Sequence, residues 1–398
     1  MKNYKNFDIE KSTLIILILS FLIVSSKLNS SGQYAYHPPE NINDGLVAGS
    51  LDEANIDVKL IEKGVNKIHQ GGYKEVHSLL IFKDNKLVFE EYFDGHSYKW
   101  EATRHHGDWQ SWDKTIPHDI KSVTKSITST CIEIAIDHGF IQSVHQSIFD
   151  YLPDHQHLKT GGRDKITIEH LLTMTSGLEW PEWSAPYSSV ANPCLGIWYQ
   201  DKDPVSYILE KPMVNEPGQH FNYSSGNTII LGEIIKHSTN MLIDEFSKTY
   251  LFEPLMIDSS YWSIHYDNGV IEAAGSLELT PRAMLKIGIL FLNKGAWEGN
   301  QIISEKWIEK SAVSFAGNNG INIPGVGSGR NGYSYSWWTN SVFHSGKFYD
   351  LFSAGGWGGQ EIMVFPQIKT VVVFTGGNYL SKTPPFKILK RYIIPAID

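Results

Sequence analysis

Two side chains three residues apart, Ser122 and Lys125, could form a nucleophile and the base that activates it. Residues three apart share one face of a helix, so the lysine amine could reach the serine hydroxyl. A serine hydroxyl is a weak nucleophile until a neighbouring base takes its proton, and a desolvated amine can be that base. The first turn of a helix adds backbone N–H groups that favour developing negative charge. The pair therefore predicts acyl transfer through a covalent intermediate on Ser122.

The same Ser-x-x-Lys spacing recurs at Ser111 and Lys114, so spacing alone does not identify the nucleophile. That second pair lies in a polar segment before Pro117, and no apolar helix follows it. Residues 121–140, in contrast, carry apolar side chains at helical spacing, which predicts a mostly buried helix. A serine at a helix start can also act only as an N-cap, and this alternative stays open on the pair alone.

The rest of the chain predicts strands near both ends and helices between them. A hairpin is expected at residues 78–82 and 86–93, and a long ordered loop at 94–119. The other expected helices are 167–175, 227–237 continuing to 250, 280–293, 304–311 and 385–397, and the other expected strands are 332–340, 361–365 and 369–375. This order predicts one sheet completed by both ends of the chain and carrying a helical insertion.

Five segments, in order along the chain, resemble the serine β-lactamase and penicillin-binding superfamily, in its class C and esterase-like branch. They are residues 122–141 (the nucleophile helix), 166–178, 217–235 (the Tyr-x-Asn motif), 273–295 and 352–377 (the strand pair with the third motif). The resemblance spans roughly residues 75–395. It implies an α+β, β-lactamase/transpeptidase-like fold: an antiparallel sheet built from both chain ends and flanked by helices, with a helical subdomain inserted at about 140–300.

The resemblance also implies a role for each motif residue. Ser122 attacks the carbonyl, Lys125 helps to deprotonate it, and Tyr223 shuttles the proton to the leaving group as a general base or acid. The oxyanion hole would use the backbone N–H groups of Ser122 and Gln360. The residues expected to bind substrate are Ser225, Trp357, Gly358 and Gly359. The two glycines would let the strand backbone approach the substrate without a Cβ between them.

Two departures from the family pattern bear on the substrate. Ser225 replaces the asparagine of Tyr-x-Asn, so a side-chain amide that often contacts a substrate carbonyl is absent. Trp357-Gly358-Gly359 replaces Lys-Thr-Gly, and an indole cannot pair with a substrate carboxylate as that lysine does. The Trp-Gly-Gly version resembles family VIII carboxylesterases and the relatives of 6-aminohexanoate-dimer hydrolases. We therefore expect a serine hydrolase that cleaves a small-molecule ester or amide.

Other classes of function fit less well. The chain has no Gly-x-Ser-x-Gly elbow and no His-Glu-x-x-His motif, and its best histidine cluster, residues 154–157, falls in an expected surface loop. We expect no metal and no cofactor. A net charge of −9 argues against nucleic acid as a partner. The alternatives that remain are a β-lactamase, a D-Ala-D-Ala carboxypeptidase, or a slow-turnover, penicillin-sensor-like binding protein on the same fold.

The N-terminal residues predict export. Three lysines precede an apolar stretch at residues 13–24, which is shorter than the roughly 20 residues that span a bilayer. Residues 1–31 therefore read as a signal peptide, the alternative being an uncleaved membrane anchor, and the protein is expected to be periplasmic or secreted. Residues 32–74 would form a tether and a first helix, and residues 75–398 the hydrolase domain. Cys131 and Cys194 are not expected to pair.

Overall fold

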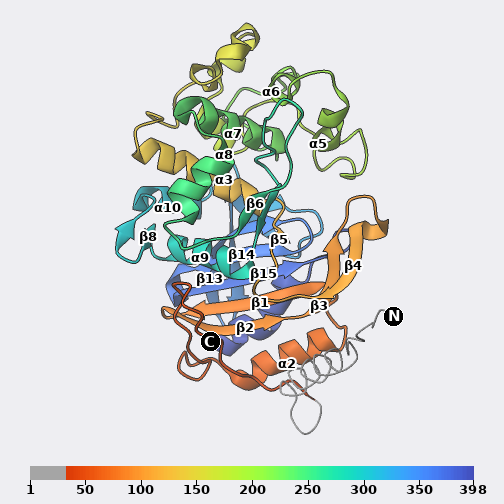
Figure 1. Cartoon of the computed structure of the whole chain (residues 1–398), viewed down its shortest axis with the longest axis vertical. Coiled ribbons are helices and arrows are strands. Elements are labelled where there is room, and N and C mark those ends of the chain that lie inside the picture. The colour runs from red at the N-terminus through yellow and green to blue at the C-terminus, as the bar shows by residue number, and fades with distance from the viewer. Residues whose placement is uncertain (1–32) are drawn as a thin grey trace, which may run out of the picture.

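A computed structural model describes residues 33–398, so the expected signal peptide lies outside the described residues. Its centre is an eight-stranded antiparallel sheet in the order β10-β11-β12-β13-β14-β15-β1-β2 (Figure 1). The strands are β1 Val76–Lys83, β2 Lys86–Tyr92, β10 Ile321–Asn322, β11 Arg330–Ser334, β12 Trp337–His344, β13 Lys347–Gly356, β14 Gln360–Phe365 and β15 Thr370–Gly376. Because β1 from the early part of the chain pairs with β15 from the late part, the predicted antiparallel sheet built from both chain ends is confirmed.

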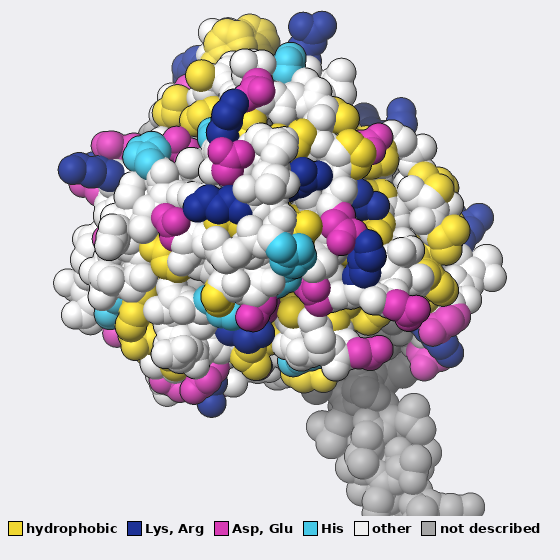
Figure 2. Space-filling view, turned by 90° about the horizontal axis from the view of Figure 1, so that it is seen from above, with side chains coloured by type: hydrophobic (Ala, Val, Ile, Leu, Met, Phe, Trp, Pro, Cys, Tyr) yellow, Lys and Arg dark blue, Asp and Glu magenta, His cyan; other side chains and the backbone are white. Residues whose placement is uncertain are grey.

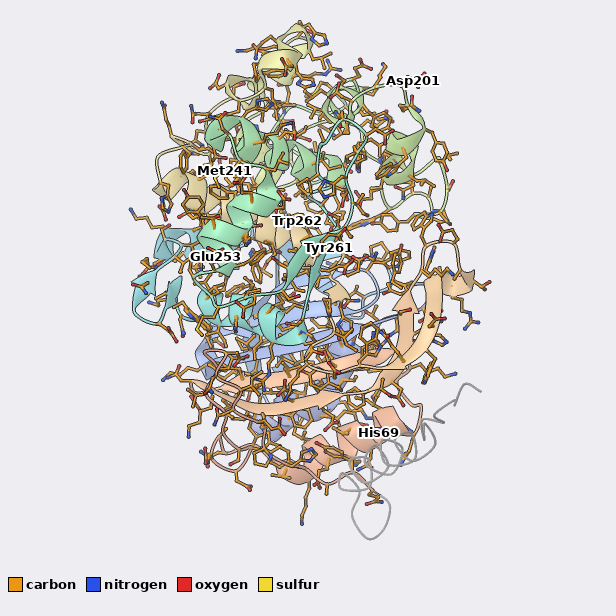
Figure 3. All side chains as sticks on the ribbon, viewed as in Figure 1. His69, Asp201, Met241, Glu253, Tyr261 and Trp262 are labelled. Carbon is orange, nitrogen blue, oxygen red and sulfur yellow. The ribbon has the colours of Figure 1, made fainter. Side chains whose placement is uncertain are left out.

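Helices cover both faces of this sheet. The central strands β14 and β15 are buried along their whole length, and each contains an apolar run, 362–365 in β14 and 371–374 in β15. On one face lie α2 Val58–His69 and the C-terminal helical segment from α11 Pro385–Ile388 to α12 Ile394–Ile397, which share an apolar cluster with the sheet. On the other face lie α3 Val123–Asp137 and α9 Pro281–Leu292. Figure 3 shows His69 at the end of α2, far from the helical region that holds Asp201 and Met241.

Most helices between residues 140 and 260 form a region above the sheet in Figure 1. The main helix there is α7 Ser225–Thr239, which packs along α3 and begins at Ser224, whose hydroxyl accepts the N–H of Asn227 at 3.2 Å. The other helices are α4 Ile168–Leu172, α5 Pro193–Gly196, α6 Pro204–Leu209 and α8 Ile243–Ser247. α9 lies within the expected insertion limits but packs on β14 and β15. α10 Glu305–Ala312 packs beside β11 and β12.

Helix α3 is unusual because it is polar and yet buried in 13 of its 15 residues. Its hydroxyl groups are paired with main-chain carbonyls: Ser126 with Ser336 at 2.6 Å, Thr128 with Ala273 at 2.7 Å and Ser129 with Tyr335 at 2.7 Å. These bonds satisfy side chains that would otherwise be costly to bury. The serines and threonines of α3 thus bind the helix to two other segments, the turn at Tyr335 and Ser336 and the segment at Ala273.

Three expectations about the elements were wrong. Residues 94–119 do not form only a loop, because β3 Asp94–Tyr98 and β4 His106–Ser111 make a hairpin there, and β5 His118–Asp119 joins β7 Leu277–Leu279 and β6 Ser260–Trp262. The single strand expected at 332–340 is two strands, since Tyr335 and Ser336 have φ of 45° and 65° and turn the chain back. The expected helix at 227–250 is broken at Asn240, which has φ of 58°.

The surface carries charges of both signs. On the face shown in Figure 2, acidic and basic side chains are interspersed, with hydrophobic side chains in small groups between them. None of the helices within residues 33–398 combines the length and the apolar character needed to cross a bilayer. Cys131 and Cys194 are both free.

Candidate active site

Ser122 and Lys125 lie as the sequence predicts, at the start of α3. Lys125 is 2% exposed, and its Nζ lies 3.0 Å from Ser122 Oγ and 2.9 Å from the carbonyl oxygen of Ala274. Ser122 occupies the N-cap position of α3, but its side chain makes no capping hydrogen bond. The alternative of a purely capping serine therefore does not fit the structure, and the hydroxyl faces the lysine amine.

The turn before Ser122 fixes where its side chain points. Lys121 has φ of 50°, a left-handed conformation that a non-glycine residue adopts only when its surroundings impose it. Asp119 holds this turn, because its carboxylate accepts the N–H of Lys121 at 3.3 Å and also pairs with the Lys121 ammonium. Asp119 is itself fixed in β5, which pairs with β7.

Neither the backbone N–H of Ser122 nor that of Trp357 makes a hydrogen bond within the described part of the chain. The segment Gly355–Trp357 lies against the turn before α3, since a Cβ on Gly356 would come 2.3 Å from the carbonyl oxygen of Ile120. Gln360, the second oxyanion donor expected from the sequence, lies elsewhere. It pairs with Gly356 in the β13–β14 ladder, and its side chain bonds to Gly376 at 2.5 Å.

Tyr223 packs beside the pair, with Lys125 Nζ 5.1 Å from the centre of its ring. Its ring also stacks on Trp183 at 5.0 Å and on Trp338 at 5.8 Å. Burial raises the pKa of Tyr223 well above its usual value, the charge of Glu182 raises it further, and a hydrogen bond with Ser122 opposes the rise. The raised pKa of Tyr223 keeps its phenol protonated at neutral pH.

Glu182 accepts several hydrogen bonds on this side of the site, and its role was not predicted from the sequence. Its carboxylate accepts the Ser225 N–H at 2.7 Å, the Ser225 hydroxyl at 2.9 Å, the Trp180 indole N–H at 2.9 Å and the Tyr187 hydroxyl at 2.9 Å. Both the N–H and the hydroxyl of Ser225 are thus hydrogen-bonded to Glu182, and Ser225 also lines a cavity. No local pattern in the sequence marks Glu182.

Trp357, Gly358 and Gly359 form the turn between β13 and β14. Both glycines have positive φ, of 95° and 98°, and a Cβ on Gly358 would come 2.6 Å from the ring of Tyr379. They are therefore required by the turn and by ring packing, in addition to any approach of substrate. The Trp357 indole donates to the carbonyl oxygen of Tyr379 at 2.6 Å, which fixes the orientation of its ring.

Two cavities meet at Ser122, and both are lined by Ser122, Tyr187 and Trp357. The sheet-side cavity has a volume of about 440 Å³, and its wall includes Tyr223, Val326, Trp338, Leu380, Lys382 and Phe386. The helix-side cavity has a volume of about 480 Å³, and its wall includes Tyr98, Trp100, Trp180, Leu195, Trp198 and Glu272. A substrate bond placed at Ser122 would thus have room for a group on each side.

Charged groups on the cavity walls differ between the two sides. Glu272 lies in the helix-side cavity, where burial raises the pKa of its carboxyl group and the charge of Lys125 opposes that rise. Lys121 lines the same cavity but is paired with Asp119. Lys382 lines the sheet-side cavity. Histidine is absent from the described residues that line either cavity, and in the 154–157 cluster His155 pairs with Asp203 at 3.0 Å.

Comparison with known proteins agrees with this architecture. The Beta-lactamase family model matches residues 76–385. The chain is 25% identical over 264 residues to 6-aminohexanoate-dimer hydrolase of Paenarthrobacter ureafaciens, covering 64% of this chain and 65% of that protein. It is 25% identical over 219 residues to a "Putative D-alanyl-D-alanine carboxypeptidase" of Salmonella agona, covering 53% and 49%. The chain thus spans about half to about two thirds of the length of these curated relatives.

Solved structures show the same fold. A crystal structure of a family VIII carboxylesterase superimposes with a TM-score of 0.64 at 15% identity, covering 91% of this chain and all of that one. Identity this low supports the fold and nothing finer. Because the family model covers most of the chain and the sheet, helices and motif order agree with it, the protein belongs to the Beta-lactamase family of hydrolases.

Proposed function

We propose that this protein is an exported serine hydrolase that cleaves an ester or amide bond through an acyl-enzyme on Ser122. The observation that carries the proposal is the 3.0 Å distance between Lys125 Nζ and a Ser122 hydroxyl that is free of any capping bond. Export is inferred from residues 1–31 of the sequence alone. The family supplies the broad class, hydrolase, and the geometry of the pair supports the mechanism.

In the proposed first step, Ser122 Oγ attacks the substrate carbonyl while the amine of Lys125 takes its proton. The bond from Lys125 to the Ala274 carbonyl holds the amine in place for this transfer. The tetrahedral oxyanion would accept hydrogen bonds from the free N–H groups of Ser122 and Trp357, a pair that replaces the expected pair of Ser122 and Gln360.

In the second step, the protonated phenol of Tyr223 gives its proton to the leaving group and recovers one from Lys125. The leaving group departs as an alcohol or amine, and the acyl group stays on Ser122. Water then attacks the acyl-enzyme and gives its proton to the same relay, which releases the acid and restores the serine. Each proton that leaves one group is accepted by another within the relay.

The cavity walls favour substrates that are neutral near the reacting bond. Trp357 stands where penicillin-recognising relatives have a lysine, and its indole N–H is already bound to Tyr379. A substrate carboxylate at this point would lose water and gain no cation, which costs a few kcal/mol. A neutral ester or amide avoids that cost.

A second candidate function, hydrolysis of a substrate with a free carboxylate, is supported by Lys382 in the sheet-side cavity. Such a substrate could be a D-Ala-D-Ala peptide or a β-lactam. The carboxylate would then be held by Lys382 instead of by a lysine at position 357. A third possibility is a sensor that is acylated but does not turn over.

Covalent labelling tests the proposal directly. The mature protein is treated with a fluorophosphonate, digested, and the adduct located by mass spectrometry. We expect the adduct on Ser122, no labelling of Ser122→Ala, and normal labelling of the matched variant Ser126→Ala, whose hydroxyl is bound to Ser336. An adduct on another residue would overturn the assignment. Hydrolysis of p-nitrophenyl butyrate over many turnovers then separates an enzyme from a sensor.

The substrate class is tested by a ratio. It compares kcat/KM for a chromogenic cephalosporin with that for p-nitrophenyl butyrate in the wild type, Trp357→Lys and Lys382→Ala. We expect the wild type to prefer the ester and Trp357→Lys to shift the ratio toward the cephalosporin. A wild type that prefers the cephalosporin, and loses that preference in Lys382→Ala, would instead establish the second candidate function.

A further inference from the structure

A second cluster of reactive side chains lies outside both cavities, on the β3–β4 hairpin. It consists of Glu75, just before β1, His96 in β3 and His106 at the start of β4. One ligand atom from each of the three lies within 4.8 Å of the other two. The three residues come from separate segments that the fold brings together.

The hydrogen bonds of this cluster already resemble those around a bound metal. His106 Nε2 lies 3.0 Å from the carbonyl oxygen of Gly377, so in the neutral ring this nitrogen carries the hydrogen and the other ring nitrogen has the lone pair. Metal-binding histidines are typically oriented in this way, by a bond from the distal N–H to a carbonyl. His96 Nδ1 lies 2.9 Å from Glu75 Oε1, and its ring stacks on that of His106 at 4.4 Å.

The other oxygen of Glu75 is held by two groups. Oε2 accepts the backbone N–H of His96 at 3.1 Å and lies 3.4 Å from Nε2 of His77, a histidine that is 1% exposed and stacks on Trp112. The packing is close, because a Cβ on Gly95 would come 2.5 Å from the His77 ring. The contacts to Oε2 thus fix the orientation of the Glu75 carboxylate, and its other oxygen, Oε1, faces His96.

We propose that Glu75, His96 and His106 bind a divalent transition-metal ion, with zinc as the best match. Two imidazole nitrogens and one carboxylate oxygen are ligands that zinc takes at about 2.0–2.2 Å, which places tetrahedral ligand atoms about 3.4 Å apart. Side-chain movements of about an ångström bring the three atoms to that spacing. Water would fill the fourth position, and the His96 side chain, 32% exposed, leaves a path for the ion.

Such an ion would not touch a substrate at Ser122, because none of its three ligands lines either cavity; it would only position the cavity walls. It would fasten the β3–β4 hairpin to the start of β1 and, through His106, to Gly377 at the end of β15. The hairpin carries Tyr98 and leads to Trp100, which line the helix-side cavity, and Gly377 precedes Asn378 and Tyr379, which line the sheet-side cavity. The ion would therefore hold one wall of each cavity. The sequence does not predict this site, because the three ligands share no motif.

The test is metal binding by the whole mature protein after treatment with a chelator. Zinc is titrated by calorimetry against a competing chelator, and cobalt is added separately to give a visible absorption spectrum that reports nitrogen and oxygen ligands. We expect one zinc per chain, a melting temperature raised by zinc and unchanged by magnesium, and the same binding in Ser122→Ala. Absence of zinc binding by the wild type would overturn the proposal, whether or not the protein hydrolyses esters.

Variants locate the site. His96→Ala and His106→Ala should each weaken zinc binding on the order of a hundredfold or more, as loss of a direct ligand must exceed the effect of losing a supporting group. Glu75→Gln keeps an oxygen acceptor for the neighbouring N–H groups and should also lose affinity, so it tests the site if an alanine variant does not fold. The matched control, His157→Ala, removes an exposed histidine and should bind as the wild type does. Unchanged binding in all three ligand variants would place the ion elsewhere and refute the assignment.

Discussion

Serine side chains occur both at the start of α3 and in the two turns that follow, but their hydrogen-bond partners differ. In the first turn, the hydroxyl of Ser122 is bound to an amine and opens onto two cavities. In the following turns, the hydroxyls of Ser126 and Ser129 are bound to main-chain carbonyls in the protein interior. Of these three serines, only Ser122 is bound to an amine and lines the two cavities.

Ionisable groups on the two parts of the helix differ in the same way. Lys125 has a serine and a carbonyl for partners and lies at a cavity wall. Glu133, two turns on, is 4% exposed and bound to the hydroxyl of Ser304, which begins α10. Residue type therefore does not separate the proposed catalytic positions of α3 from the structural ones, whereas their hydrogen-bond partners and their access to a cavity do.

The largest effect should come from Ser122→Ala. Loss of the nucleophile should lower kcat/KM for p-nitrophenyl butyrate at least a thousandfold. The free energy of unfolding should change by less than the ~1 kcal/mol of a typical N-cap, since Ser122 makes no capping bond. The control is Ser111→Ala, which removes the serine of the other Ser-x-x-Lys pair. Retained turnover in a folded Ser122→Ala protein would show that Ser122 is not the nucleophile.

Lys125→Ala and Tyr223→Phe should each lower kcat/KM on the order of a hundredfold. The double variant should be little worse than either single variant, because both side chains serve one proton relay. The measurement is a double-mutant cycle on p-nitrophenyl butyrate hydrolysis. Effects that simply multiply would show that the two groups act in separate steps.

Glu133→Gln should change how stability depends on pH. Burial raises the pKa of Glu133 from 4.5 to about 7, and its hydrogen bond with Ser304 opposes the rise. Between these values the unfolded chain has released the proton that the folded chain still holds, so the folded state loses stability as the pH rises from 4.5 to about 7. Glutamine does not titrate, so the variant should lack this loss, which amounts to a few kcal/mol.

Urea unfolding at several pH values measures this effect. The control is Glu253→Gln, which changes an exposed carboxyl group in the helical region (Figure 3) and should leave the pH profile as it is. A Glu133→Gln profile that parallels the wild type would mean that Glu133 is ionised in the folded protein throughout this range.

The sequence predicted what depends on short-range pattern. The apolar spacing of α3 and α9 and the β1–β2 hairpin are local features, and the structure confirms them. The Ser122 and Lys125 contact also needed only a helix, because side chains three residues apart must meet on one face.

What the sequence did not predict depends on distant partners. The β3–β4 hairpin is polar and has no alternating pattern, so its pairing could not be foreseen from residues 94–111. The turn at Tyr335 and Ser336 is held by the hydroxyls of Ser129 and Ser126 from α3. Gln360 was expected at the oxyanion hole because motif position was read as spatial position, but the turn at 357–359 carries Trp357 to the cavity instead.

The smallest effect on activity is expected for Ser126→Ala and Ser129→Ala. These variants test most sharply whether the later turns of α3 differ in role from its start. Each change leaves a buried carbonyl, of Ser336 or Tyr335, without its donor, which should cost about 1–3 kcal/mol in the free energy of unfolding. Turnover should fall by no more than a few-fold, since neither hydroxyl lines a cavity. Urea unfolding and kcat/KM measured on the same preparations check both points. If Ser126→Ala lost as much activity as Ser122→Ala while remaining folded, the distinction between the first turn of α3 and the rest would fail. The β11–β12 turn would then have to be counted among the elements that hold Tyr223 and Trp338 in position for catalysis, because that turn leads directly into the strand that carries Trp338.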